Sequence, residues 1–453
     1  MRVLLFTGKG GVGKTSVAAG TAVLGALRGM RTLVLSTDAA HSLGDAFDLP
    51  VGSEPTLVDT NLYVQQVDAQ RRFEQSWSEI QTYLKSVLDT VGVDPIAAEE
   101  LTVLPGAEEV MALLELRDQV RSGRWDLIVV DCAPTGETLR LLALPEALSW
   151  YMDRVLPMER RMVRVLKPVL TRAAGVPMPG DSTFTALERL HADLAEVRAI
   201  LGGASASVRL VLTPEAVVVA EARRTLTSLC LYGYRVDGVV ANRVFPSAGA
   251  DPWRRQWVAA QRDVLEEVDA SFAPLEVWRS LYRACEPVGL EELAALAAHM
   301  YGGADPFEVP DAAERPRLER AGADGSASLR VELPFADRDS VDLARHGDEL
   351  VVTVGSHRRL LSLPVALRGS KVASAKVKGG ALVVRFAPPA VDRGDGPGER
   401  GAGGRGAGVD GAAGGAAAGA GAGVAQPVEG AGGVVLPSGR GSASVEWSVE
   451  VRT

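Results

Sequence analysis

The stretch "RVLLFTGKGGVGKTSVAAG", residues 2–20, joins an apolar run to a helical run through a glycine-rich loop, and this order is the strongest indication of the fold. Residues 2–7 are typical of a parallel strand that is buried on both faces. The residues from Lys14 onward have helical character. Between the two runs, "GKGGVGKT" at residues 8–15 fits the phosphate-loop pattern, and a preceding strand with a following helix is the context that this motif requires.

Similar apolar runs recur along the chain, and polar residues follow each of them. The runs are "RTLVLSTD", "YVQQVDA", "WDLIVVDCAP", "SVRLVLTPE" and "VDGVVANRVF". Strands that alternate with longer helical segments predict an α/β fold with a mostly parallel sheet and right-handed crossovers. Ligands of such sheets bind at the carboxyl ends of the strands, which is where these polar residues would lie.

Two long, mainly helical segments, at about 68–123 and 143–205, predict a helical insertion in this α/β domain. The second segment mixes apolar residues with many arginines. This mixture fits a surface helix pair that packs on the core, and it also fits a helical layer that faces a partner or client. Both interpretations stay open at the level of the sequence.

The composition changes near residue 303. Short alternating runs such as "DELVVTVGSHRRLLSLP" then indicate strands, and the Gly-Gly of "KVKGGALVV" suits a hairpin turn. The Gly/Ala-rich tract beyond them has almost no bulky side chains and cannot bury a core. We therefore predict a phosphate-loop domain at 1–302, a linker at 303–326, a small antiparallel β-sandwich at 327–388, a disordered tract at 389–441 and a strand-like tail at 442–453.

The overall charge and the cysteines limit the classes of partner and compartment. A formal charge of −9 and a pI near 5.3 argue mildly against nucleic acid or an anionic membrane as the main partner. No window is apolar enough to span a bilayer, and the start of the chain does not look like a signal peptide. Three scattered cysteines fit a reducing cytoplasm. We expect a cytoplasmic protein with no nucleic-acid partner and no stable membrane insertion.

The glycine-rich loop predicts a site for ATP and Mg²⁺. Its glycines allow the backbone to turn tightly and to point N–H groups at phosphate oxygens, and the following helix adds its positive dipole end. The expected phosphate-binding residues are Gly8, Lys9, Gly10, Gly11, Val12, Gly13, Lys14, Thr15 and Ser16. Lys14 would reach the β- and γ-phosphates, and the Thr15 hydroxyl would ligate Mg²⁺. Asp131, which closes the apolar run "WDLIVVD", would hold the metal directly or through water.

Asp38 is a candidate for the chemical step. It follows a predicted buried strand in "STDAAHS", so its carboxylate would lie at the same edge of the sheet as the loop. A carboxylate that faces the γ-phosphate can orient or deprotonate the attacking water. An aspartate in this position can equally cap a helix, and the residue alone does not decide between these roles.

Three motifs together resemble one family. "GKGGVGKT", "DAAHSLGDAF" and "DCAPTGETLRLLALPE" are similar to those of the arsenite-pump and tail-anchored-protein-targeting ATPases, a branch of the deviant phosphate-loop dimeric ATPases. The resemblance covers residues 1–302 and implies ATP hydrolysis by a homodimer. In this group the lysine that matches Lys9 reaches across the dimer to the partner's nucleotide. The resemblance also assigns water activation to Asp38 and the magnesium side to Asp131.

The same resemblance implies further site residues. It places a second switch segment at Pro134, Thr135 and Gly136. It places nucleoside contacts at Glu215 and Asn242, although either residue alone would more simply cap a loop. The Asn242 amide suits adenine because it can both donate and accept. "CEPVGLEEL" resembles the loop that closes over the base, which adds two expected contacts, Pro287 and Val288.

The chain also departs from this family. It lacks the CxxC pair that clamps the dimer of the eukaryotic members through zinc, and its three cysteines do not resemble the metalloid-binding set of the arsenite pumps. A methionine-rich client groove is not evident either. The segment at 327–388 resembles the small-heat-shock-protein-like domain of some bacterial members, with an unrelated β-sandwich as the alternative.

These observations together predict a Mg²⁺-dependent, homodimeric ATPase that couples ATP binding and hydrolysis to conformational change, in order to handle a protein client or a membrane-protein partner. Two other functions remain as alternatives. One is a partitioning or positioning ATPase that assembles on DNA or membrane, and the other is the motor of a metalloid-efflux (arsenite) pump.

Overall fold

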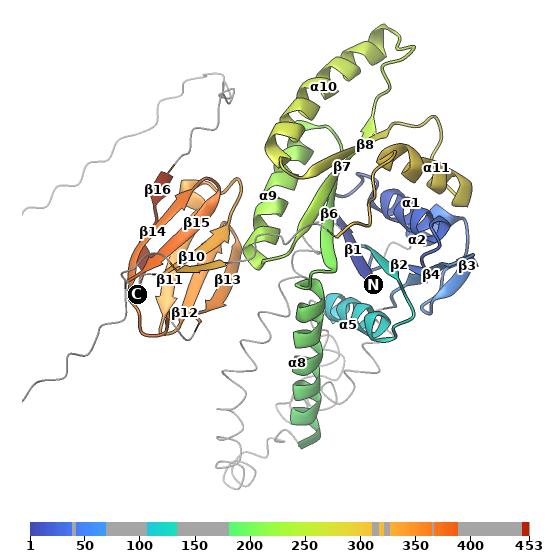
Figure 1. Ribbon diagram of the computed structural model, residues 1–453. Helices are drawn as coiled ribbons and strands as arrows, with labels where there is room; N and C mark the ends of the chain where they lie inside the picture. Colours follow the sequence, from blue (N-terminus) through green and yellow to red (C-terminus); the bar gives the residue numbers. More distant parts are fainter. Residues whose placement is uncertain are drawn as a thin grey trace, which may run out of the picture.

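The computed structural model describes residues 1–38, 42–68, 107–133, 181–309, 317–320, 327–364, 367–387 and 446–452. Its largest sheet has eight strands in the order β3-β4-β2-β5-β1-β6-β7-β8, and every neighbouring pair is parallel except β3 with β4. The predicted α/β fold with a mostly parallel sheet is confirmed (Figure 1). The strands are β1 (Arg2–Thr7), β2 (Thr32–Ser36), β3 (Thr56–Asp59), β4 (Leu62–Gln66), β5 (Leu127–Asp131), β6 (Ala206–Leu212), β7 (Val236–Val244) and β8 (Glu276–Leu281).

Helices cover both faces of this sheet, and small residues allow them to pack closely. On α1, a Cβ at Gly20 would lie 2.8 Å from the carbonyl oxygen of Leu293 on α11, so glycine lets the two helices touch. Of the expected helical insertion the structure describes α5 and α8, and residues 69–106 and 134–180 lie outside the described part. The helices are α1 (Lys14–Leu27), α2 (Ser42–Phe47), α5 (Ala107–Arg121), α8 (Asp181–Leu201), α9 (Ala216–Tyr232), α10 (Pro252–Phe272) and α11 (Leu290–Tyr301).

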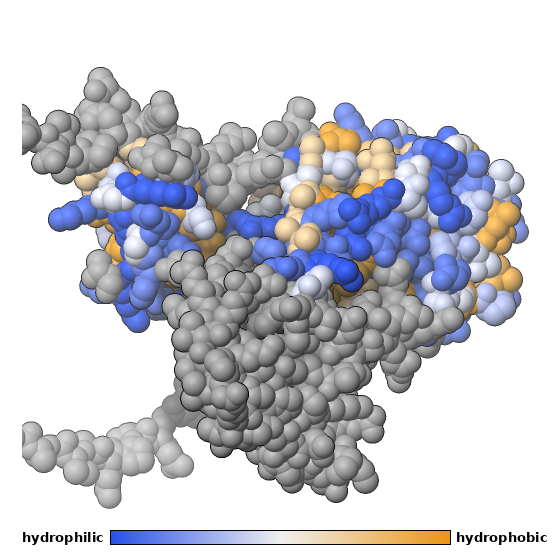
Figure 2. All heavy atoms as spheres, turned by 90° about the horizontal axis from the view of Figure 1, so that it is seen from below, coloured by the Kyte–Doolittle hydropathy of each residue, from blue (hydrophilic) through white to orange (hydrophobic). Residues whose placement is uncertain are grey.

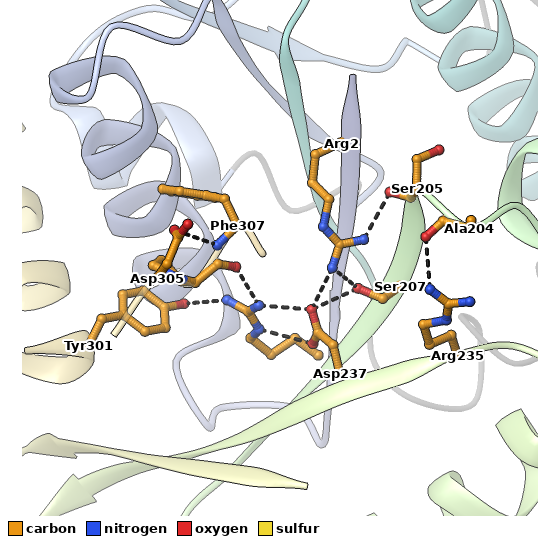
Figure 3. Close-up of polar contacts among 11 residues, drawn as sticks. Arg2, Ala204, Ser205, Ser207, Arg235, Asp237, Tyr301, Asp305 and Phe307 are labelled. Carbon is orange, nitrogen blue, oxygen red and sulfur yellow. Dashed lines mark hydrogen bonds and ion pairs between the residues drawn. The ribbon is translucent and has the colours of Figure 1, made fainter. Parts of the chain in front are cut away.

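A cluster of buried charges joins β1, β6 and β7 (Figure 3). Asp237 accepts hydrogen bonds from Arg2 Nη2 at 2.9 Å, from Arg209 Nη2 at 2.8 Å and from Ser207 Oγ at 2.7 Å. All three charged side chains are at most 5% exposed. Burial lowers the pKa of Arg2 to about 10, and the Asp237 carboxylate opposes this change. The carboxylate therefore balances two guanidinium groups that water cannot reach.

Arg209 extends the same cluster to α11. Its Nη1 donates to the hydroxyl of Tyr301 at 2.9 Å, and its Nη2 also donates to the carbonyl oxygen of Pro306 at 2.8 Å. The guanidinium carbon lies 4.4 Å from the ring centroid of Trp278 on β8, which is cation–π geometry. Residues directly after α11 thus pack on the α/β core, although the sequence placed them in a linker.

The C-terminal part is a β-sandwich of two sheets, ordered β16-β14-β15-β10-β9 and β13-β12-β11-β17. Leu329, Leu350 and Phe386 belong to the core that the two sheets share. The predicted hairpin is confirmed, since Gly379 and Gly380 join β14 to β15 with positive φ. The elements are β9 (Arg317–Arg320), β10 (Ala327–Glu332), the 3-10 helix η1 (Arg338–Ser340), β11 (Val341–His346), β12 (Glu349–Val354), β13 (His357–Ser362), β14 (Val372–Lys378), β15 (Ala381–Phe386), β16 (Glu446–Ser448) and β17 (Val451–Arg452).

The sandwich recruits strands from both flanking segments. Strand β9 lies within the segment expected as a linker and pairs with β10. The strand-like tail, for which the sequence offered no partner, divides between the sheets: β16 pairs with β14, and β17 pairs with β11. The pairing of β17 with β11 is parallel, so this edge differs from the antiparallel arrangement expected for the whole sandwich.

The sandwich lies beside α9 (Figure 1). Leu231 near the end of α9 is part of the sandwich core. Arg359 of β13 donates to the carbonyl oxygen of Leu231, and Thr227 donates to that of Pro334. One helix therefore contacts both the central sheet and the sandwich.

None of the helices that the structure describes is both long enough and apolar enough to cross a bilayer. On the face that Figure 2 shows, hydrophilic residues predominate among the coloured atoms, and apolar residues are scattered between them.

We predict that Asp237→Ala lowers the free energy of unfolding by about 3–5 kcal/mol, because it leaves two guanidinium groups buried without their counter-ion. Asp269→Ala is the matched control, since Asp269 pairs with Arg279 at 2.5 Å but both side chains are about half exposed. The control should cost about 0–1 kcal/mol. Urea unfolding followed by circular dichroism measures both, and equal losses would contradict the role given to the cluster.

Candidate active site

The loop between β1 and α1 lies against the carboxyl ends of β6 and β7, and two glycines permit this contact. A Cβ at Gly8 would lie 2.0 Å from the carbonyl oxygen of Val211. A Cβ at Gly13 would lie 2.4 Å from Nδ2 of Asn242, and Gly13 also has a left-handed φ of 87° directly before α1. No other residue fits these positions, so the sequence pattern reflects close backbone approach as well as turn geometry.

The two lysines of the loop have different surroundings. Lys14 is only 7% exposed, and its Nζ donates to the carbonyl oxygen of Lys9 at 3.4 Å. The Lys9 side chain is 41% exposed, and its Nζ lies 3.9 Å from a carboxylate oxygen of Glu221 on α9. Lys14 is thus enclosed by its own loop, whereas Lys9 points outward to a neighbouring helix.

Thr15 and Asp131 form the centre of the site. The Thr15 hydroxyl lies 3.1 Å from that of Ser42 at the start of α2. Asp131 ends β5 and is fully buried, yet neither carboxylate oxygen makes a hydrogen bond of normal length and angle with another described residue. A buried carboxylate that makes no hydrogen bond of normal geometry and lies beside a hydroxyl is a donor set that fits Mg²⁺, which prefers oxygen ligands.

The electrostatic state of Asp131 follows from its surroundings. Its pKa is raised from 3.8 to about 7, chiefly by burial and to a smaller extent by the nearby Asp38 carboxylate. The Thr15 hydroxyl and the Lys14 ammonium lower it, but they do not offset the burial. Perturbed carboxyl groups of this kind concentrate at functional sites.

Asp38 lies at the same edge of the sheet, just after β2. Its backbone N–H donates to Ser36 Oγ at 3.2 Å, and its carbonyl oxygen accepts from Gln66 Nε2 at 2.7 Å. The preceding residue, Thr37, donates its N–H to the carbonyl oxygen of Asp131 at 3.0 Å. The ends of β2, β4 and β5 therefore hold the backbone of Asp38 close to the loop. The second switch residues Pro134, Thr135 and Gly136 lie outside the described residues.

A cavity of about 330 Å³ opens beside the loop. Asn242 is 7% exposed and donates its Nδ2 to the carbonyl oxygen of Val12 at 2.8 Å. Two of the expected nucleoside contacts, Glu215 and Val288, are not among the residues that line this cavity. Glu215 lies on the surface directly before α9, and Val288 is 41% exposed. The residues that line the cavity include Gly13, Ser16, Asn242, Arg243, Tyr282, Arg283, Glu286 and Pro287.

The structure adds residues that the sequence analysis did not select. Ser42 contacts Thr15, Glu221 contacts Lys9, and the cavity includes Arg243 and Tyr282. Arg243 directly follows Asn242 in "ANRV", so its position at a polar strand end was a usable signal. Glu221 lies within a helix, where nothing in the local sequence points to the loop.

This strand, glycine loop and helix, with an enclosed lysine and a buried carboxylate at the next strand end, define a phosphate-loop nucleoside triphosphate hydrolase. Comparison with known families agrees. The family described as anion-transporting ATPase matches residues 1–302, and the HSP20-like domain found in ArsA matches residues 324–386. The chain belongs to the anion-transporting ATPase family, and it is an ATPase whose C-terminal part has an HSP20-like domain.

Several relatives extend over most of the chain. A protein of Streptomyces coelicolor, named as uncharacterized, is 40% identical over 86% of this chain and 98% of its own length. A protein of Prosthecochloris vibrioformis, named provisionally as an arsenical pump-driving ATPase, is 37% identical over 82% of this chain and 92% of its own length. The ATPase get3 of Aspergillus terreus is 28% identical over 66% of this chain and 92% of its own length.

We predict that Asp131→Asn raises the Tm of the nucleotide-free protein at pH 8 when a chelator has removed metal ions. The pKa of Asp131 is 3.8 in a model peptide and about 7 in the folded state. Between these values the folded protein keeps a proton that the unfolded chain has released, so the unfolded state is increasingly favoured and the fold loses stability as the pH rises through this window. The asparagine side chain carries no charge at any pH, so Tm should increase by about 3 °C or more at pH 8. At pH 5, which is closer to the unfolded pKa of 3.8, the increase in Tm should be less than half as large, and an equal shift at both pH values would contradict this explanation.

Proposed function

We propose that the chain is a Mg²⁺-dependent ATPase that acts as a homodimer and couples ATP binding and hydrolysis to the handling of a protein client. The observation that carries this proposal is the divergence of the two loop lysines. One is enclosed by its own loop, and the other is directed away from it toward Glu221. A site that needs both lysines is complete only when a second subunit supplies one of them.

The subunit's own residues bind the phosphates and the metal. Backbone N–H groups of the glycine loop and the Lys14 ammonium hold the β- and γ-phosphates. Thr15 and Asp131 would hold Mg²⁺, with Asp131 acting directly or through water. When bound, the metal neutralises charge on the phosphate oxygens. Across the described residues no three His, Cys, Asp or Glu side chains gather as a metal site, which suits a metal held chiefly by phosphates and one carboxylate.

Asp38 is proposed to orient and deprotonate the attacking water. Its backbone is fixed at the end of β2, and its carboxylate is close enough to raise the pKa of Asp131. The two carboxylates then have separate roles, one toward the metal and one toward the water.

Asn242 is proposed to select adenine. The carbonyl oxygen of Val12 can only accept a hydrogen bond, so the amide must direct its Nδ2 to the loop. This leaves Oδ1 to accept from the amino group of adenine, whereas guanine offers an acceptor at the corresponding position. Pro287 lines the same cavity and would contact the base, and Glu215 and Val288 would do so only if their loops close over it.

Lys9 is proposed to reach the nucleotide of the partner subunit. A cation from another chain stabilises charge on the phosphoryl group as it transfers, in the manner of an arginine finger. The contact of Lys9 with Glu221 is long and half exposed, so leaving it costs little. Hydrolysis would then require dimer closure.

The proposal predicts complementation between two inactive variants. Lys9→Ala and Asp38→Asn should each lower ATP turnover by about 100-fold or more. In a heterodimer of the two, the Lys9→Ala subunit keeps its own Asp38 and receives Lys9 from its partner. An equal mixture with exchanged subunits should therefore recover about a quarter of wild-type turnover, since half of the dimers are mixed and each has one complete site.

The control for complementation is an equal mixture of Lys14→Ala and Asp38→Asn. Both changes damage the site of the subunit that carries them, so no mixed dimer has a complete site and turnover should stay at the level of the single variants. Light scattering coupled to gel filtration verifies that dimers form with ATP. Two results would contradict the role of Lys9. One is recovery of ATP turnover in the control mixture, and the other is no recovery of ATP turnover in the Lys9→Ala mixture although mixed dimers have formed.

Client handling is supported by the HSP20-like domain and by its contact with α9, the helix whose Glu221 meets Lys9. Arsenite transport has less support, because Cys132, Cys230 and Cys285 lie after β5, on α9 and in the loop after β8. We therefore propose a protein client or a membrane-protein partner, and we expect arsenite to leave ATP turnover unchanged.

We predict that the full-length protein suppresses aggregation of chemically unfolded luciferase, and that the nucleotide changes the extent of suppression. The Asp38→Asn variant, loaded with ATP, should differ by about two-fold or more from the same variant loaded with ADP, because the two states place α9 and the sandwich differently. Light scattering during dilution of the luciferase measures this. Lys14→Ala should show no nucleotide effect, and the absence of suppression in every state would refute client handling.

A further inference from the structure

Strand β7 contains a bulge at the cavity. Ala241 pairs with Arg279 and Val244 pairs with Leu281, so two residues of β7, Asn242 and Arg243, lie opposite a single residue of β8. Arg243 has a φ of 58°, which is rare for a residue with a side chain. Successive residues of a regular strand point to opposite faces, but here both Asn242 and Arg243 line the cavity.

A buried glutamine of α10 holds this bulge in place. Gln261 is 8% exposed. Its Nε2 donates to the carbonyl oxygen of Arg243 at 3.1 Å, and its Oε1 accepts from the N–H of Phe245 at 2.7 Å. One side chain thus satisfies the backbone on both sides of the left-handed residue. Unfavourable backbone geometry that the surroundings enforce in this way is typical of functional positions.

Arg243 is exposed at the cavity, and no hydrogen bond or ion pair of its guanidinium is found among the described residues. The other arginine of the cavity, Arg283, donates to Glu292 at 2.6 Å. The residue that the bulge directs to the cavity is therefore a planar cation that is available to a ligand.

We propose that Arg243 stacks its guanidinium plane on the face of the nucleotide base. This inference rests on the proposed function, in which Asn242 meets the edge of the same base. The phosphates already have Lys14 and the loop backbone, whereas Asn242 meets only the edge of a purine and leaves its flat faces to other residues of the cavity lining. Arginine suits this position because its planar, weakly hydrated group stacks on aromatic rings, which a lysine ammonium does less well.

The test compares ATP with ribose 5-triphosphate, which lacks the base, by isothermal titration calorimetry. Arg243→Ala should raise the Kd for ATP by about ten-fold and leave that for ribose 5-triphosphate unchanged. Arg243→Lys should bind ATP nearly as weakly as the alanine variant, because it keeps the charge but loses the plane. Gln261→Leu should weaken ATP binding in the same direction, since the bulge loses its support.

Arg243→Gly separates the side chain from the backbone. Glycine accepts a positive φ, so this variant should melt about 2 °C higher than the wild type while it binds ATP as weakly as the alanine variant. Arg262→Ala is the surface control, because Arg262 is 68% exposed and contacts only its neighbour Asp263 among the described residues. It should bind both ligands like the wild type.

Other outcomes overturn the inference. Unchanged ATP affinity in Arg243→Ala would exclude a contact with the nucleotide. Equal weakening of both ligands, with rescue by lysine, would assign Arg243 to phosphate. Failure of the proposed function looks different: the wild type would not bind ATP, or Lys14→Ala would bind it equally well.

Discussion

The central sheet depends on one buried carboxylate, Asp237, which neutralises the guanidinium groups of Arg2 and Arg209. These residues belong to β7, β1 and β6, and a shift of any strand would leave a charge unpaired in the core. The pairing therefore fixes the relative positions of three neighbouring strands. With these positions fixed, the carboxyl ends of the same strands hold the glycine loop against Val211 and Asn242. The loop lies so close to these two residues that only glycine fits there.

Two buried aspartates show how the two edges of the sheet differ. Asp237 accepts hydrogen bonds from two arginines and a serine, so its charge is fully compensated. Asp131 is equally buried but makes no hydrogen bond of normal length and angle with the described residues, and the nearby Thr15 hydroxyl and Lys14 ammonium do not prevent its pKa from rising to about 7. A carboxylate in that position costs stability until a cation arrives. Of these two buried aspartates, the one with the less compensated charge lies at the edge of the sheet where the nucleotide site lies.

Much of this fold and site follows from local sequence. Apolar strands and the glycine loop predicted the parallel sheet, and residues such as Lys14 and Asp131 occupy fixed places relative to those strands. Contacts between distant segments were not predictable in this way. Glu221 meets Lys9 because α9 happens to pass the loop, and the partners of the last two strands follow from the closure of the sandwich. Arg243 reaches the cavity because of a bulge, which alternation along a strand does not indicate.

Helix α9 connects the nucleotide loop with the C-terminal sandwich. Near its start, Glu221 is the partner of Lys9 and also lines a hollow of about 510 Å³ between α9 and the sandwich. Near its end, Thr227 and Leu231 are bound by residues of the sandwich. A helix transmits displacement along its length because its backbone hydrogen bonds make it stiff. In the proposed dimer, Lys9 would leave Glu221 for the partner's nucleotide, and the Glu221 carboxylate would lose its cation beside the hollow. Closure of such a dimer would therefore change the charge at the surface that the sandwich faces.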